Sequence, residues 1–171
     1  LLPFFAKAQT RQHTLDNLKQ ALRSASTDSS RYNIANRLVL FYYQSNRDSA
    51  LQYSEIGLSI AEKNNMAINV AEMLGHKGYQ LYQLKRFGGA LKFLLRAKKI
   101  AQDPANENKV FTPGKYPDLR KKRLNILGAI LQSLGHLKGA TGDTTQLIVH
   151  YLEAIKIGEE ITYSYWMSEF E

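Results

Sequence analysis

The 171-residue sequence contains no cysteine and only four prolines. The absence of cysteine excludes disulfides, zinc sites with thiolate ligands and thiol nucleophiles. The scarcity of proline permits long helices, because a proline inside a helix removes a backbone hydrogen bond and clashes with the preceding turn. No stretch of the sequence approaches the roughly 18 consecutive apolar residues that indicate a membrane-spanning helix. We therefore expect no membrane span within this chain.

Recognisable catalytic motifs are also missing. The four histidines, His13, His76, His136 and His150, form neither an HExxH motif nor an i, i+4 pair that would indicate zinc. The glycines between Gly135 and Asp143 lack the spacing of a phosphate-binding loop, and no strand is expected before them. No GxSxG motif or paired-carboxylate arrangement stands out. We therefore predict that this segment is not an enzyme and that it needs neither a cofactor nor a metal.

The sequence has an excess of positive charge. Its 23 Lys and Arg outnumber 15 Asp and Glu, for a net charge of +8. This balance would suit nucleic acid, anionic lipid or an acidic protein partner. The densest basic run, 115–123, is short and includes Asp118. We interpret the excess as the solvated surface of a basic protein and expect no nucleic-acid partner; a nucleic-acid-associated helical protein is the third alternative.

The first nine residues resemble the end of a secretory signal. An apolar run from Leu1 to Phe5 leads into Ala6-Lys7-Ala8, an A-x-A cleavage pattern. This predicts that residues 1–8 are the remnant of a signal peptide and that the protein is periplasmic or otherwise extracytoplasmic. The alternative is that these residues pack on the first helix of a cytoplasmic protein.

Apolar residues recur at helical spacing along the chain, which predicts an all-α fold. Residues 9–30 are expected to form an N-terminal helix, over 13–24, and a turn in which Asp28, Ser29 or Ser30 caps the next helix. A pattern of two helices joined by a short polar turn then occurs three times. The predicted helix pairs are 31–44 with 48–63, 66–85 with 88–102, and 117–138 with 143–161.

The three copies share a spacing of key positions. Leu38, Gly78 and Gly135 each stand twelve residues before Ala50, Ala90 and Leu147, and Gly57, Ala97 and Ala154 follow seven residues later. Most of these residues are small, and antiparallel helices approach to about 8–10 Å only where the side chains at the crossing allow it. The spacing therefore predicts repeated helix pairs rather than a single bundle.

This pattern resembles the tetratricopeptide repeat (TPR), whose helix pairs recur about every 34 residues. The strongest local match is LGHKGYQLYQLKRFGGALKFLLRAKKI, residues 74–100, followed by residues 131–157. The first copy is degenerate, with Leu38 at the small position and Arg47 at the turn aromatic. The resemblance covers residues 31–162 and implies a right-handed α-solenoid of about three repeats that binds a partner.

A narrower resemblance concerns the opening of the chain, residues 15–63. The entry Asp28-Ser29-Ser30-Arg31 and the helix start Asp48-Ser49-Ala50-Leu51 are similar to the N-terminal TPR sensor region of Bacteroidetes-type sensor histidine kinases. In those proteins a membrane span and a kinase module follow the repeats. The resemblance implies a sensory domain of a larger signal-transduction protein, with any kinase part beyond Glu171.

Two segments depart from the repeat pattern. Residues 103–116 form a polar loop with Pro104, Pro113 and Gly114, and Pro117 can begin the next helix. A loop of this length in a compact repeat is either functional or mobile, and we expect it to be mobile. Residues 163–171 carry Tyr163, Tyr165, Trp166, Met167 and Phe170. We expect this segment to cap the open end of the solenoid, to continue into a further repeat, or to mediate self-association.

The first helices of TPR pairs line a concave groove, where a peptide or protein partner would bind. Counting from the start of each copy assigns the groove residues. These are Tyr32, Val39, Tyr42, Tyr43, Glu72, Tyr79, Tyr82, Gln83, Gln132 and His136, with the small residues Ala35, Gly75, Ala129, Gly139 and Ala140. Tyrosine suits peptide recognition because it combines apolar area with a hydroxyl. Alternatively, the tyrosines pack between neighbouring first helices and expose only their hydroxyls.

The leading functional hypothesis is a non-catalytic TPR domain that binds a protein or senses a ligand outside the cytoplasm. A free-standing cytoplasmic adaptor with the same fold is the runner-up.

Overall fold

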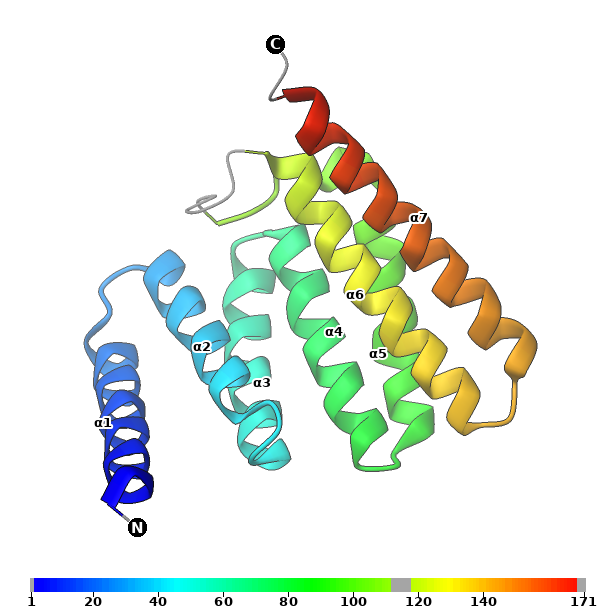
Figure 1. Ribbon diagram of the computed structural model, residues 1–171. Helices are drawn as coiled ribbons and strands as arrows, with labels where there is room; N and C mark the ends of the chain where they lie inside the picture. The colour runs from blue at the N-terminus through cyan, green and yellow to red at the C-terminus, as the bar shows by residue number, and fades with distance from the viewer. Residues whose placement is uncertain (1, 112–117, 169–171) are drawn as a thin grey trace.

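The computed structural model is a row of helices folded back and forth (Figure 1). It describes the backbone of residues 2–111 and 118–168, and the side chains of residues 9, 11–111 and 118–162. Within these ranges all regular structure is helical. The elements are α1 (Leu2–Ser24), α2 (Asp28–Tyr42), α3 (Arg47–Lys63), α4 (Ala67–Gln83), α5 (Phe87–Gln102), the short 3-10 helix η1 (Pro104–Asn106), α6 (Leu119–Ala140) and α7 (Thr144–Ser168).

The helices form two layers. Helices α2, α4 and α6 follow one another across the molecule, and α3 and α5 lie behind them (Figure 1). Each first helix packs against its successor in the pairs α2–α3, α4–α5 and α6–α7, and α1 flanks α2. The predicted all-α solenoid of antiparallel helix pairs is confirmed. Within the described residues, no helix has the length and apolar character needed to cross a bilayer.

Glycines close two of the three pairs, as the spacing predicts. A Cβ atom on Gly78 would lie 2.5 Å from Cγ of Leu94, and one on Gly135 would lie 2.6 Å from Cε1 of Tyr151. In the first copy the expectation for Gly57 is wrong. A Cβ there would lie 2.7 Å from Sδ of Met73, which is on α4. The missing side chain of Gly57 therefore makes room for α4 of the next repeat, and not for the packing of α3 on α2.

Several helix boundaries differ from the prediction. Helix α1 begins at Leu2 rather than His13. Helix α2 is capped by Thr27, whose Oγ1 accepts a hydrogen bond from the Ser30 amide at 3.1 Å; Asp28 is already helical. The N-cap of α6 is Asp118, whose Oδ1 accepts a hydrogen bond from the Lys121 amide at 2.9 Å. The predicted start at Pro117 lies outside the described residues.

Residues 103–111 of the connection from α5 to α6, here called the strap, make hydrogen bonds with α4, and the expectation that the loop is mobile stays a prediction. The Ile68 amide donates to the Lys109 carbonyl at 3.0 Å, and the Phe111 amide donates to Oδ1 of Asn69 at 2.7 Å. Phe111 is buried with its ring 5.4 Å from that of Tyr32. The strap therefore ties α4 to α2. The rest of the loop lies outside the described residues.

The predictions for the two ends of the chain, a signal-peptide remnant and a C-terminal cap, remain untested. Residues 2–8 continue the backbone of α1, but their side chains, and the whole of Leu1, lie outside the described part. Helix α7 extends to Ser168, and the aromatic side chains predicted to cap the solenoid or to mediate self-association also lie outside it.

Candidate functional site

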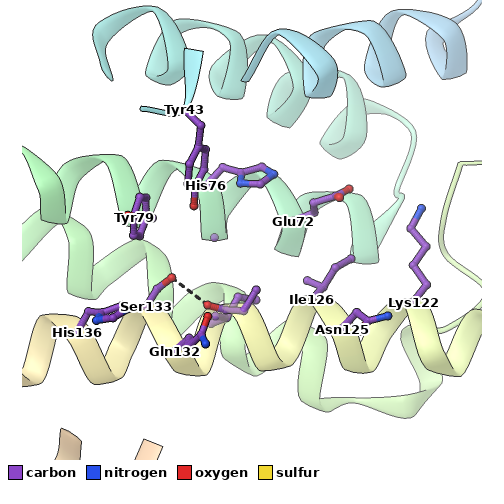
Figure 2. Close-up of a pocket in the computed structure, with 13 residues that line it drawn as sticks. Tyr43, Glu72, His76, Tyr79, Lys122, Asn125, Ile126, Gln132, Ser133 and His136 are labelled. Atoms are coloured by element: carbon purple, nitrogen blue, oxygen red, sulfur yellow. Dashed lines mark hydrogen bonds between the residues drawn. The ribbon is translucent and has the colours of Figure 1, made fainter. Parts of the chain in front are cut away.

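A cleft of about 410 Å³ opens on the side of the molecule formed by the first helices, mainly between α4 and α6 (Figure 2). Its volume falls within the range of ligand pockets in proteins. The residues that line it are Tyr43, Glu72, Gly75, His76, Tyr79, Lys122, Asn125, Ile126, Ala129, Ile130, Gln132, Ser133 and His136.

Small side chains account for the hollow. Gly75 on α4 and Ala129 on α6 leave space where longer side chains would fill the junction. Below them Ile130 closes the floor: a Cβ on Gly75 would lie 3.1 Å from its Cγ1. Ser133 donates to the Ala129 carbonyl at 2.9 Å, so its hydroxyl hydrogen is already used within α6 (Figure 2). The two helices thus touch at the floor and diverge above it.

One wall of the cleft belongs to a continuous row of rings, here called the aromatic row: Tyr43, Tyr79, Tyr82, His136 and Tyr151. Tyr43 and Tyr79 stack at 4.9 Å with an interplanar angle of 7°, and Tyr82 stacks on His136 at 6.2 Å. Tyr79 and Tyr82 are 6.0 Å apart, and the Tyr151 hydroxyl is 2.8 Å from Nδ1 of His136. The row links the C-terminal end of α2 to α7, with each ring held by its neighbours.

The opposite end of the cleft is polar, with Glu72 on α4 and Lys122 and Asn125 on α6 (Figure 2). The Glu72 carboxylate accepts hydrogen bonds from the Tyr32 hydroxyl at 2.5 Å and from Nδ2 of Asn36 at 3.2 Å. Burial, and secondly the charge of Glu72, raise the pKa of Tyr32 well above its usual value. Tyr32 therefore remains a neutral donor that fixes the carboxylate.

His76 lies between these two ends. Its ring meets Tyr43 edge-on at 5.6 Å, and Nε2 is buried with no hydrogen-bond partner among the described residues. Burial lowers the pKa of His76, and the nearby charge of Glu72 opposes this only in part. The imidazole is therefore neutral near pH 7. Burial, and secondly the neighbouring Tyr79, also raise the pKa of Tyr43, so this hydroxyl keeps its proton.

The structure brings seven of the predicted groove residues to the lining of this cleft: Tyr43, Glu72, Gly75, Tyr79, Ala129, Gln132 and His136. Two more lie beside it. Tyr82 belongs to the aromatic row, and Nε2 of Gln83 donates to the Tyr79 hydroxyl at 2.8 Å. Whether a partner contacts any of these residues stays a prediction.

Four of the assigned groove residues are placed differently, and Gly139 and Ala140 do not line the cleft. Tyr32, Ala35 and Val39 are 1%, 0% and 0% exposed, so a partner has no access to them. Tyr42 stacks on Tyr53 at 5.8 Å in a cluster with residues of α1, away from the cleft. The counting rule fails here because α1, α4 and the strap cover positions that an isolated repeat would expose.

The prediction missed six residues that line the cleft: His76, Lys122, Asn125, Ile126, Ile130 and Ser133. His76 follows Glu72 by four residues and so shares its helix face. The α6 positions recur at steps of three and four, which also marks one face. Lys122, Asn125 and Ile126 were missed because the third copy was counted from Gly128, which leaves out the first turns of α6. Ile130 and Ser133 lie inside that copy, at positions that the count did not assign to the groove.

Comparisons with known proteins place the chain among TPR proteins. The family model of the SusR N-terminal TPR domain matches residues 7–109. No curated protein matches the chain. Among solved structures, the crystal structure of BtubC (BKLC) from P. vanneervenii superposes with a TM-score of 0.51 at 17% identity, covering 92% of this chain and 76% of that one. At this identity the likeness shows the fold alone.

Proposed function

Since the chain belongs to the SusR N-terminal TPR domain family, we propose that it is a non-catalytic domain that binds a peptide or a segment of a partner protein in its concave groove. The observation that carries the proposal is the cleft between α4 and α6, where an aromatic wall faces a polar end. Aromatic side chains provide apolar contact, and the exposed amides of Asn125 and Gln132 provide hydrogen bonds for an extended backbone.

A small-molecule ligand is the second candidate, because a cleft of about 410 Å³ is large enough to enclose one. In this case the domain would be a ligand sensor rather than a docking platform. We further propose that the domain is the extracytoplasmic sensory part of a larger signal-transduction protein. The resemblance of residues 15–63 to sensor kinases and the signal-like residues 1–8 support this; the kinase module itself stays a prediction. A cytoplasmic adaptor remains the alternative.

Filling the cleft tests the proposal. Ala129 is exposed within it, so Ala129→Trp should block the cleft without disturbing the core. Ala140 is exposed on the same helix but does not line the cleft, which makes Ala140→Trp the matched control. Peptides selected on the wild-type domain from a random-peptide phage library should bind Ala140→Trp normally and lose at least about tenfold in affinity for Ala129→Trp. Equal binding to both variants would rule out the cleft as the peptide site.

Two further measurements address the alternatives. If no peptide is selected, a small-molecule library is screened instead. A small molecule whose binding is abolished by Ala129→Trp but not by Ala140→Trp would favour the ligand-sensor function. Fusion of the intact precursor to alkaline phosphatase, which is active only after export, tests the extracytoplasmic location. An inactive fusion that accumulates to normal levels would favour the cytoplasmic adaptor.

A further inference from the structure

A second feature of the molecule lies on the layer opposite the cleft and concerns charge. Between Glu72 and Asp103 the sequence contains seven Lys and Arg residues and no Asp or Glu. This segment, in which all charged residues are Lys or Arg, covers most of α4, the turn after it and the whole of α5. It accounts for most of the net charge of +8.

The seven cations divide into two groups. Three of them pair with carboxylates on other helices: Lys77 with Glu55 at 2.9 Å, Arg96 with Glu62 at 2.7 Å and Lys98 with Glu153 at 2.9 Å. The other four, Lys85, Arg86, Lys92 and Lys99, are exposed, and no salt bridge joins them to a carboxylate within the described ranges. The unpaired charge of the segment is therefore concentrated around α5.

The register of α5 places these cations on its outer face. Ala90, Leu94, Ala97 and Ala101 are fully buried and define the face that packs into the molecule. Lys92, Arg96 and Lys99 fall on the opposite face at helical spacing, over a length of about 10 Å. Leu95, which is 49% exposed, lies among them. Lys85 and Arg86 stand in the turn that leads into the same helix.

Helix α5 is also the middle helix of its layer, because Arg96 reaches α3 on one side and Lys98 reaches α7 on the other. Helix dipoles favour Lys99, in the last turn of α5, and Lys85, directly after the C-cap of α4, but they do not explain all of the charges. Arg86 is the N-cap residue of α5, where the helix dipole disfavours cations, and the first turn of α5 holds no acidic residue.

We propose that the outer face of α5, formed by Lys92, Leu95 and Lys99 with Lys85 and Arg86 at its end, docks onto an anionic phospholipid bilayer. Four to eight clustered cations attract anionic headgroups, and an apolar side chain among them can enter the headgroup layer. Duplex nucleic acid would satisfy the cations but leave Leu95 in contact with phosphate and water. A bilayer satisfies both kinds of side chain. This inference does not depend on the cleft.

Vesicle co-sedimentation of the full 171-residue chain tests the docking surface. With vesicles of phosphatidylglycerol and phosphatidylcholine we expect binding that weakens as salt is raised, and with pure phosphatidylcholine much weaker binding. Each cation near such a surface contributes about fivefold in partitioning, so Lys92→Gln with Lys99→Gln should reduce binding about 25-fold. Leu95→Gln should reduce it by a smaller factor.

The matched control removes two exposed arginines of α2, Arg31→Gln with Arg37→Gln, and so changes the net charge by the same amount. All variants replace exposed side chains, and circular dichroism checks that they remain folded. The control should retain nearly full binding to anionic vesicles. Equal loss in both double variants would overturn the proposal in favour of unspecific charge attraction. Absence of vesicle binding at low salt, or α5-dependent binding to soluble polyglutamate or duplex DNA instead of vesicles, would also overturn it.

Discussion

The two junctions between neighbouring first helices differ sharply. Between α2 and α4 the junction is sealed: Tyr32 and Asn36 donate to Glu72, and Phe111 of the strap packs on Tyr32. Between α4 and α6 the helices meet through Gly75 and Ile130, and the cleft opens above that contact.

The difference shows how a repeat protein obtains a binding site. The same helix-pair geometry produces core at one junction and a hollow at the next. What decides between them is the length of the side chains at the junction and whether a connecting segment crosses it. The strap crosses the first junction and is tied to α4 through Asn69.

The largest effect is expected from removing the Phe111 ring from the closed junction between α2 and α4. Phe111→Ala removes a buried ring and should lower the free energy of unfolding by about 3 kcal/mol. Urea denaturation measures this change. Lys109→Ala is the control: its side chain is exposed, and the bond to Ile68 uses its carbonyl, so the change should stay below about 0.5 kcal/mol. Equal stability of the two variants would mean that the strap does not hold the junction.

The hydroxyl of Tyr32 is the next target. Tyr32→Phe keeps the ring but removes the donor to the Glu72 carboxylate, which should cost about 2 kcal/mol because hydrogen bonds to charged groups are among the stronger ones. The same denaturation measurement on Tyr42→Phe, a tyrosine that stacks on Tyr53, should show a much smaller loss. A loss in Tyr32→Phe no greater than in this control would argue against a sealing role for the carboxylate.

A smaller effect concerns pH. Because burial holds the pKa of His76 below its ordinary 6.5, the unfolded chain binds a proton before the folded one does. His76 therefore adds stability above pH 6.5, and this is lost as pH falls from 6.5 through the folded-state pKa, by at most about 1.4 kcal/mol per pH unit. Denaturation curves over this range should show a shallower decline for His76→Phe. The decline that remains should include His150, whose pKa is also lowered, chiefly by burial. Parallel curves would contradict the prediction.

The smallest effect is expected at the open junction. Gly75→Ala gains up to about 1 kcal/mol of helix propensity, but its Cβ would stand 3.1 Å from Ile130, so the net change should be within about 0.5 kcal/mol. At Gly128 a Cβ would lie 3.7 Å from Ile157, an ordinary contact, so Gly128→Ala should be stabilising. A clear stabilisation by Gly75→Ala, measured in urea, would show that α4 and α6 separate easily at the floor.

Much of the fold could be predicted from the sequence because it depends on local spacing. The 3.6-residue period marked the helices, and glycine at positions 78 and 135 marked where two pairs close. The cleft was predicted only in part. Tyr43 and Tyr79 were assigned to the groove, whereas Lys122 and Asn125 were missed because the start of the third copy was set too late.

That this chain is a helical repeat protein, and where its helix pairs turn, depends on residues close together along the chain and so can be inferred from local spacing. Which groove positions stay open depends on how the helices pack together. Tyr32 is buried by contacts with residues 37 and 40 positions away, and Phe111 is held by Asn69, 42 positions away. Contacts over such separations leave no periodic mark in the sequence, because they depend on how each pair stacks on the next and on the path of the strap.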